Sequence, residues 1–332
     1  MKTTVAIVGL GSRGRVTYAP IAKQYPDLME ITALADINPA CVEEAAKEYN
    51  VPKERCFTSA EELLAQPKLA DAIFICTQDQ DHVREALVAL EKGYHILMEK
   101  PISPSAEDCN KLLEASRKYD RKIVVCHVLR YTPFFSKIKE IISEGIIGDV
   151  VTIQAIENVG YWHQAHSFVR GNWRNSNTTS PMCLQKTCHD FDLYLWLADK
   201  TPERVSSMGD TYFFKEACAP EGAALRCMDG CKAKENCPFD AEKIYITNKR
   251  TGIAQGNTEW PVDVLAIHPT EESIYEAIKT GPYGRCVFHC DNNVVDHQIT
   301  NIENTDGSNI SFSMSGFTSD GASRYCKIMG TK

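Results

Sequence analysis

Short hydrophobic runs alternate with amphipathic segments through about the first 142 residues of the chain. Between the runs, apolar residues recur at helical spacing. This alternation predicts parallel strands joined by right-handed helical crossovers in a doubly wound sheet. The predicted strands are residues 4–9, 30–36, 71–77, 95–99 and 122–127, and the predicted helices are residues 41–50, 82–93 and 106–119.

The pattern changes after Gly148, where long strands with alternating polar and apolar residues begin. Turn residues between such strands, as in NTDGSN, favour an open, mostly antiparallel sheet. A helix is predicted from about Pro181 to Ala198. We therefore predict an α/β fold in two domains, a dinucleotide-type sheet domain over 1–127 and an α+β domain over 128–332. The strands of the second domain are predicted at 149–159, 294–304, 309–317 and 323–330.

Composition agrees with a folded protein of two domains. The chain has 332 residues, of which 43% are hydrophobic and 24% charged, as in average globular proteins. The net charge of −8 argues against a nucleic-acid partner, which needs clustered Lys and Arg. No apolar run has the length of a membrane span, and the start reads as a strand rather than a secretory signal. We expect a soluble, cytoplasmic protein whose partner is a small molecule.

A glycine-rich turn follows the first predicted strand and opens a helical segment, which is the setting in which G-x-G-x-x-G binds a pyrophosphate. The second long strand ends in Asp36, whose carboxylate suits the ribose hydroxyls of NAD and repels the 2′-phosphate of NADP. Arg13 is the feature that could instead accommodate that phosphate. We predict a Rossmann domain that binds NAD, with NADP less favoured, through Gly9, Gly11, Ser12, Arg13, Gly14 and Asp36.

Two further segments carry residues suited to proton transfer. In HILMEKPIS, Glu99 and Lys100 stand at the carboxyl end of a predicted strand, where doubly wound sheets bind ligands. In KTCHDFD, His189 could take the proton of a reacting hydroxyl, with Asp192 one helical turn away to orient it and Asp190 facing the substrate. The alternatives are a solvated lysine and a helix-surface histidine.

A segment rich in aromatic and basic residues, GYWHQAHSFVRGNWRNS, suits a polyhydroxyl ligand that stacks on rings and bonds to polar donors. An exposed loop with some interface aromatics is the alternative. The predicted substrate contacts are Tyr161, His163, His166, Arg170, Trp173 and Arg174.

Three cysteines lie close together in a turn-rich insertion at about 215–250. Cys227, Cys231 and Cys237 have a spacing that suggests a structural zinc ion more than disulfides. Free thiols packed in a loop are the alternative. We name Cys290 as the fourth ligand, with Cys218, Cys286 and His289 as other candidates.

The motifs IVGLGSRGR, CTQDQDHVREAL, MEKP and KTCHDFD together resemble the glucose-fructose oxidoreductase and inositol dehydrogenase family (Gfo/Idh/MocA) over nearly the whole chain. The resemblance implies that Lys100 contacts nicotinamide and substrate and that His189 is the acid–base residue. It also implies cofactor contacts in the family's T-P-N-x-x-H segment, where Gln78 and Asp79 depart from the pattern. The residues concerned are Thr77, Gln78, Asp79 and His82.

One departure from the family pattern affects the predicted active site. Many relatives carry an Asp four residues before the histidine, where this chain has Gln185, and Gln cannot act as a base. Either His189 works without that carboxylate or Lys186 takes part in catalysis. Lys186 could equally be an ordinary salt-bridge partner.

The resulting hypothesis is an NAD(H)-dependent oxidoreductase that acts on a hydroxyl of a sugar, cyclitol or related polyol. The R-G-N-W-R stretch also resembles NAD-dependent glycosidases of the same superfamily, which gives an alternative reaction by transient oxidation and elimination. A non-catalytic NAD-binding sensor is the second alternative. The resemblance implies a homodimer or homotetramer through the open sheet. Because the chain stops at KIMGTK, directly after a strand, we expect the second domain to be truncated.

Overall fold

The structure of the protein is a computed structural model that describes residues 2–319 and 321–332. The chain divides into two compact units, Met1–Cys126 and His127–Lys332. Each unit is described below by itself. No helix in the described part of the chain is both long enough and apolar enough to cross a bilayer.

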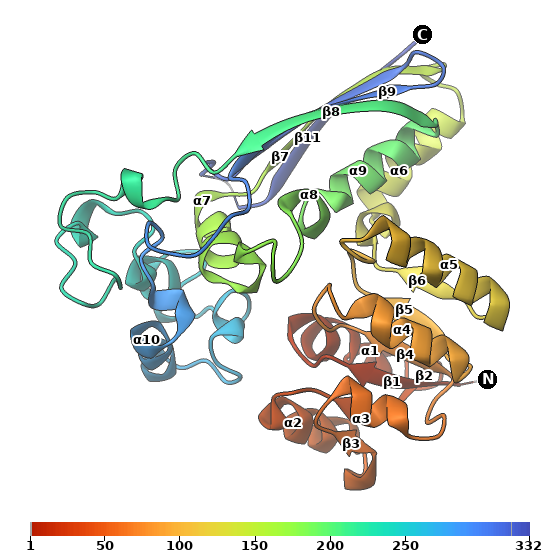
Figure 1. The fold of residues 1–332 in the computed structure, drawn as a ribbon, viewed down its shortest axis with the longest axis horizontal. Helices are drawn as coiled ribbons and strands as arrows, with labels where there is room; N and C mark the ends of the chain where they lie inside the picture. Colours follow the sequence, from red (N-terminus) through yellow and green to blue (C-terminus); the bar gives the residue numbers. More distant parts are fainter. Residues whose placement is uncertain (1, 320) are drawn as a thin grey trace. The chain divides into compact units, whose positions relative to one another are not determined.

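The described residues of the first unit form a six-stranded parallel sheet in the order β3-β2-β1-β4-β5-β6 (Figure 1). This is the strand order of dinucleotide-binding folds, and the order reverses between β1 and β4. It confirms the predicted sheet and adds the two-residue strand β3. The elements are β1 Thr3–Val8, η1 Ser12–Tyr18, α1 Ile21–Gln24, β2 Met29–Ala35, α2 Pro39–Tyr49, η2 Lys53–Arg55, β3 Cys56–Phe57, α3 Ala60–Ala65, β4 Ala72–Ile75, α4 His82–Glu91, β5 His95–Met98, α5 Ala106–Tyr119 and β6 Ile123–Val125.

The central strands of this sheet are hydrophobic on both faces because helices cover both. Val5, Ala6, Ile7 and Val8 in β1 are each at most 1% exposed. A single core cluster joins β1, β2, β4 and β5 to α3, α4 and α5. The carboxyl ends of these strands meet at one edge of the sheet, which is where a parallel sheet of this kind binds ligands.

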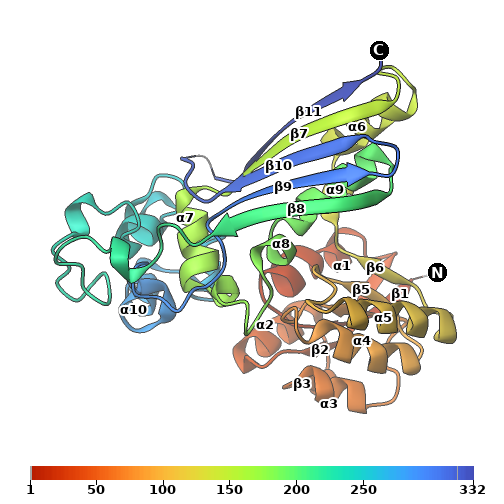
Figure 2. The ribbon, with the colours of Figure 1, turned by 45° about the horizontal axis from the view of Figure 1, so that its top comes forward.

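The described residues of the second unit form a five-stranded mixed sheet in the order β11-β7-β10-β9-β8 (Figure 2). The β7–β10 pair is parallel and the other pairs are antiparallel. Helices α6 and α9 pack on one face, where their apolar residues form a core with β7, β9 and β10. The elements are η3 Val128–Tyr131, α6 Pro133–Ser143, β7 Val150–Asn158, α8 Met182–Gln185, α9 Cys188–Ala198, β8 Pro202–Asp210, β9 His297–Asn304, β10 Asn309–Ser315 and β11 Ser323–Gly330.

The long segment between β8 and β9 folds together with the segment after β7 around a second core. This core is rich in aromatic residues and cysteines. Its helices are short, and α10 Glu271–Thr280, which begins with a capping box at Thr270, is the longest of those described. The others are α7 Tyr161–His163, η4 Gln164–Arg170, η5 Asn172–Arg174, η6 Glu216–Cys218, η7 Lys234–Asn236, η8 Lys243–Thr247, η9 Ile253–Gln255, η10 Val262–Val264 and η11 Pro282–Gly284.

Candidate functional site

The glycine turn after β1 is tightly packed at two of its glycines and open at the third. Gly9 has φ +85°, and a Cβ there would collide with the carbonyl oxygen of Cys76. A Cβ at Gly14 would collide with the carbonyl oxygen of Gly9. Gly11, in contrast, has no atom within 4 Å of the position of a Cβ. The backbone is therefore bare at Gly11, as the close approach of a pyrophosphate requires.

The different surroundings of Gly11 and Gly14 predict different effects of alanine. Gly11→Ala should leave the melting temperature unchanged and weaken NAD binding by about tenfold, which is about 1.4 kcal/mol. Gly14→Ala should destabilise the fold by about 1–3 kcal/mol, because the methyl group overpacks the turn. Thermal unfolding and NADH fluorescence titration of both variants measure the contrast. Equal losses of stability would contradict the assignment of Gly11 to the ligand.

Asp36 ties the end of β2 to the glycine turn. Its Oδ2 accepts a hydrogen bond from the backbone N–H of Leu10 at 2.5 Å, and its Oδ1 accepts from the N–H of Asn38 at 2.7 Å. The carboxylate is thus fixed beside the turn and partly exposed. Arg13 is 53% exposed and its Nε lies 3.8 Å from Glu99. The structure therefore places Gly9, Gly11, Ser12, Gly14 and Asp36 at the carboxyl ends of β1 and β2.

Glu99 holds the backbone of Lys100. The Glu99 carboxylate is 7% exposed and accepts hydrogen bonds from the Tyr18 hydroxyl at 2.5 Å and from the Lys100 N–H at 3.1 Å. Burial raises the pKa of Tyr18 far above its usual range, so that the hydroxyl remains a neutral donor. These contacts fix the point at which the Lys100 side chain leaves the end of β5. Glu99 thus acts through Lys100 rather than as an exposed cofactor contact.

His82 supports the same region from inside the domain. It is 1% exposed, and its ring nitrogens lie 2.7 Å from the carbonyl oxygen of Pro101 and 3.1 Å from that of Thr77. His82, predicted as a direct cofactor contact, thus has both ring nitrogens directed to backbone carbonyl oxygens of its own domain.

The Thr77 hydroxyl is also engaged within the protein. It donates to buried Glu85 at 2.7 Å, and burial raises the pKa of that carboxyl to about 7. Asp79, which differs from the family pattern at its position, is buried as well, at 3% exposure. Gln78 remains exposed, so that it is the member of this segment whose side chain is accessible.

In the second unit, the predicted helix from Pro181 to Ala198 is divided into α8 and α9 by a turn at Lys186 and Thr187. Gln185, in the position of the missing acid, is 3% exposed. Its Nε2 donates to the Thr179 hydroxyl at 2.9 Å and also to the Ser180 carbonyl oxygen. Gln185 is thus a structural amide that anchors the end of α8. His189 stands in the first turn of α9 and is partly exposed.

Asp192, predicted to orient His189, is bound by an arginine. Its carboxylate accepts two hydrogen bonds from the guanidinium of Arg130, at 2.7 and 2.5 Å. The ring of His127 lies 3.9 Å from Asp192 and edge-on to the ring of His189 at 6.2 Å. The helical spacing correctly placed Asp192 near His189 but could not reveal a bidentate arginine from a distant segment.

A buried cluster of four charged residues lies beside the α8–α9 turn. Lys186 Nζ lies 2.8 Å from Glu157, whose side chain is fully buried. Arg324 Nε lies 3.0 Å from Glu157 and 2.7 Å from Asp190. Burial lowers the pKa of Lys186 and raises that of Glu157, while their mutual attraction acts against both shifts. Asp190, predicted to face the substrate, is instead fully buried against Arg324. Sequence reasoning missed both Glu157 and Arg324.

The middle of the aromatic and basic segment lies in the interior of the second core, and its two ends are partly exposed. Every residue of η4, including His166 and Arg170, is buried. His166 bonds to the Tyr245 hydroxyl at 2.9 Å, and burial lowers its pKa to about 3. His163 packs edge-on to Trp260 at 4.8 Å, and Tyr161 packs against Phe239 at 6.0 Å. His166 and Arg170, predicted to contact the substrate, are instead buried inside the unit, whereas Tyr161 and His163 are partly exposed.

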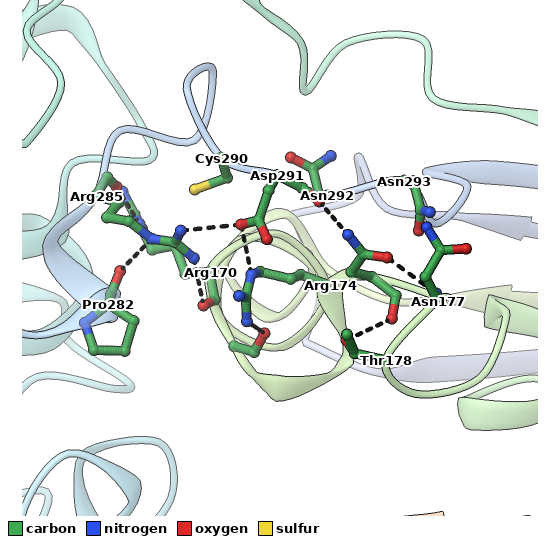
Figure 3. Close-up of polar contacts among 12 residues, drawn as sticks. Arg170, Arg174, Asn177, Thr178, Pro282, Arg285, Cys290, Asp291, Asn292 and Asn293 are labelled. Carbon is green, nitrogen blue, oxygen red and sulfur yellow. Dashed lines mark hydrogen bonds and ion pairs between the residues drawn. The ribbon is translucent and has the colours of Figure 1, made fainter. Parts of the chain in front are cut away.

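Arg174 is held by an ion pair, as Figure 3 shows. Asp291 lies between two guanidinium groups, 2.7 Å from Arg174 and 3.0 Å from Arg285. This contact fastens η5 to the segment before β9, so that Arg174, predicted to contact the substrate, has a structural partner. Trp173, at 36% exposure, is the most accessible of the predicted contacts in this segment.

The ion pairs of Asp291 with Arg174 and Arg285 predict that stability depends on pH over a narrow acidic interval. They lower the pKa of Asp291 from its usual 3.8 to about 2. A lowered carboxyl pKa stabilises the fold above about pH 4, and this contribution is lost as the pH falls toward 2. Since Asp291 is 52% exposed, Asp291→Asn should cost only about 0.5–1 kcal/mol at pH 7. Urea unfolding at pH 7 and pH 3 measures it, and an equal loss at both would contradict the ion pair as the cause.

The predicted zinc ligands are placed as follows. Cys227, Cys231 and Cys237 line one small cavity together with Cys286, while Cys290 does not belong to that lining. The fourth cysteine of this cavity is thus Cys286, one of the other candidates, and not Cys290. Within residues 2–319 and 321–332, no three His, Cys, Asp or Glu side chains form a group that could hold a metal ion as they stand.

Comparison with known families agrees with this architecture. Residues 3–127 match the model of an oxidoreductase family with an NAD-binding Rossmann fold, and residues 135–243 match the GFO/IDH/MocA C-terminal domain. The chain therefore belongs to the Gfo/Idh/MocA family of NAD(P)-dependent oxidoreductases, as the sequence motifs predicted.

Individual relatives are distant. The chain is 25% identical over 319 residues to YteT of Bacillus subtilis, which is named as an oxidoreductase; the match covers 93% of this chain and 71% of that protein. It is 28% identical over 195 residues to an inositol 2-dehydrogenase of Corynebacterium glutamicum, covering 58% of this chain and 53% of the relative. The matched part thus spans only about half the length of that dehydrogenase.

Solved structures show the same fold. All of this chain aligns with 75% of scyllo-inositol dehydrogenase from Lactobacillus casei, which was solved with NAD(H) and scyllo-inositol, at a TM-score of 0.67 and 17% identity. It also aligns with 72% of the WlbA dehydrogenase from Chromobacterium violaceum, in complex with NADH and UDP-GlcNAcA, at a TM-score of 0.67 and 17% identity.

Proposed function

We propose that this protein is an NAD(H)-dependent dehydrogenase that moves a hydride between nicotinamide and a CH–OH group of a cyclitol, sugar or related polyol. The observation that carries the proposal is the pairing, within the first unit, of a bare glycine turn with a lysine whose backbone a buried carboxylate holds. The dehydrogenases and sugar-nucleotide ligands among the relatives support the substrate class.

The residues of the first unit fit a bound NAD. Gly11 leaves its backbone open, η1 begins directly after the turn with its N–H groups available to a pyrophosphate, and Asp36 carries the charge that favours an unphosphorylated ribose. Nicotinamide, when bound, accepts or returns the hydride. Asp36 is the reason that we expect NAD to be used in preference to NADP.

The chain's own residues would handle the proton of the reacting hydroxyl. We assign to Lys100 the polarisation of the substrate oxygen, because Glu99, which Tyr18 holds in turn, fixes the Lys100 backbone directly after β5. We assign the acid–base step to His189, with Lys186 as a charged neighbour three residues before it. In the oxidation, the hydroxyl proton leaves to the base while the carbon-bound hydrogen leaves as hydride, which balances the reaction.

The test is turnover of purified protein with NAD or NADP and a panel of inositols, free sugars and sugar acids, followed by NADH absorbance. We expect at least one cyclitol or sugar to be oxidised, with NAD preferred. Binding of NADH without turnover of any panel member would indicate the non-catalytic sensor. Release of a chromogenic aglycone that depends on NAD would indicate the glycosidase, although Arg170 and Arg174, which suggested it, have structural contacts here.

We also propose that the protein forms a homodimer or homotetramer through the second sheet. Support comes from apolar side chains left exposed on its strands, namely Met208 at 62%, Ile299 at 47% and Tyr325 at 61%. Light scattering of the purified chain gives the mass that decides this.

A further inference from the structure

A small cavity in the second unit is lined by four thiols. Cys227, Cys231, Cys237 and Cys286 share it with the buried side chain of Arg170. Its volume is about 10 Å³, which is the scale of a single water molecule or ion. We propose that these four cysteines bind one structural zinc ion, which fastens the long insertion between β8 and β9.

Backbone pairing places two of the four cysteines on neighbouring extended segments. Arg226 and Arg285 form an antiparallel bridge, in which the Cys227 N–H donates to the Gly284 carbonyl oxygen and the Cys286 N–H to that of Leu225, both at 2.9 Å. Because side chains alternate across extended backbone, Cys227 and Cys286 project to the same side of this bridge. The bridge thus supplies two ligands from segments far apart in the sequence, as many zinc sites require.

The charge of Arg170 is the second, independent observation. The side chain is 0% exposed and its guanidinium is permanently protonated. It donates to the carbonyl oxygens of Arg285 at 2.6 Å and Phe239 at 2.7 Å and to the Cys227 sulfur at 3.4 Å. Its Nη1 has no hydrogen-bond partner, and the ion pairs of the described residues include no carboxylate bonded to it. A buried cation of this kind needs an anionic neighbour.

Neutral thiols cannot supply that negative charge. Zinc displaces thiol protons when it binds, and four thiolates around Zn²⁺ carry a net charge of −2. The complex would therefore compensate the buried charge of Arg170.

Binding requires the sulfurs to close on a common point. They are not grouped as ligands in the absence of an ion, and tetrahedral zinc demands Zn–S distances of about 2.3 Å. Cys227 and Cys286 are fixed by the bridge, whereas Cys231 and Cys237 lie in turns on either side of η7. We therefore expect Cys231 and Cys237 to move inward when the ion binds.

Metal analysis of the full chain, purified without chelator, tests the proposal without any measurement of turnover. We expect one zinc per chain in the wild type, loss of zinc in Cys286→Ser and Cys231→Ser, and full retention in the matched control Cys290→Ser. Cys290 is suited to this comparison because its thiol lies four residues from Cys286 and donates to the Cys286 carbonyl oxygen at 3.2 Å.

A second measurement covers variants that fail to fold. In the wild type, a mercurial reagent should release one zinc per chain to a colorimetric chelator, and alkylation mapped by mass spectrometry should find the four cavity cysteines protected until the ion is removed. Folded wild type that contains no zinc after growth in zinc-supplemented medium would overturn the proposal. So would a disulfide among the four cysteines, or loss of the ion in Cys290→Ser alone.

Discussion

Replacing Lys100 by methionine should lower the turnover number with the best substrate of the panel by about 10²–10⁴-fold, the range that a positioned proton-transfer or polarising group contributes. Methionine keeps the length of the side chain and removes only its charge. Two contacts hold the segment. The Lys100 N–H donates to Glu99, and a ring nitrogen of His82 contacts the Pro101 carbonyl oxygen. Both contacts use the backbone of residues 100 and 101 and survive the change. NADH affinity should therefore change by only a few-fold.

Steady-state kinetics and NADH fluorescence titration together measure this effect. Lys111→Met is the matched control, because Lys111 is a 51% exposed lysine of α5 in the same unit whose ion pairs are with its own helix. Turnover that Lys100→Met leaves within a few-fold of the wild type would remove Lys100 from the mechanism. A parallel loss of NADH binding would instead assign Lys100 to cofactor binding alone.

The sequence predicted the first unit well because its elements are defined by local signals. Buried parallel strands appear as continuous apolar runs, and the glycine turn and Asp36 have fixed spacing. The second sheet was predicted with one strand missing. All nine residues of β8 are exposed, so that PERVSSMGD carries no alternation of apolar and polar residues, and its pairing with β9 is visible only in three dimensions.

The site was predicted only as far as local patterns reach. The glycine turn, Asp36 and the place of Lys100 at the end of β5 follow from spacing. Interactions between distant segments do not follow from spacing, and they determine the partners of the other predicted site residues. Asp192 forms an ion pair with Arg130, Asp190 with Arg324, and Arg174 with Asp291. The aromatic segment was misread for a related reason. Its mixture of rings and charges resembles a sugar-binding surface, but its middle part, η4, is buried in the second core.

The charge cluster at Lys186 lies next to Gln185 in the sequence and contains two carboxylates. Glu157 in β7 and Asp190 in α9 bring two carboxylates to this region, and Lys186 and Arg324 balance them. The cluster as a whole is neutral, with two positive and two negative groups. Removal of a single member leaves an uncompensated charge at a largely buried site, which is far more costly than losing an exposed pair.

Glu157→Gln should therefore lower the free energy of unfolding at pH 7 by about 3–5 kcal/mol. The double variant Glu157→Gln/Lys186→Met should recover most of this loss, because it restores neutrality while Arg324 keeps Asp190. The loss of unfolding free energy in Glu157→Gln should become smaller as the pH rises. Without Glu157, the folded-state pKa of Lys186 falls further below its unfolded value near 10.4, so that loss of its proton favours the folded state through that interval.

Guanidinium unfolding at pH 6 and pH 9 measures each of these differences. Glu48→Gln is the matched control, because Lys23 and Glu48 form an ion pair of the same length, 2.8 Å, with side chains 55% and 43% exposed. We expect that substitution to cost less than about 1 kcal/mol, and to cost the same at both pH values. If Glu157→Gln proved as mild as Glu48→Gln, or if the double variant were less stable than the single one, the four charges would not form one compensated unit. The ion pair between Lys186 and Glu157 would then contribute no more to stability than the ion pair of a surface lysine.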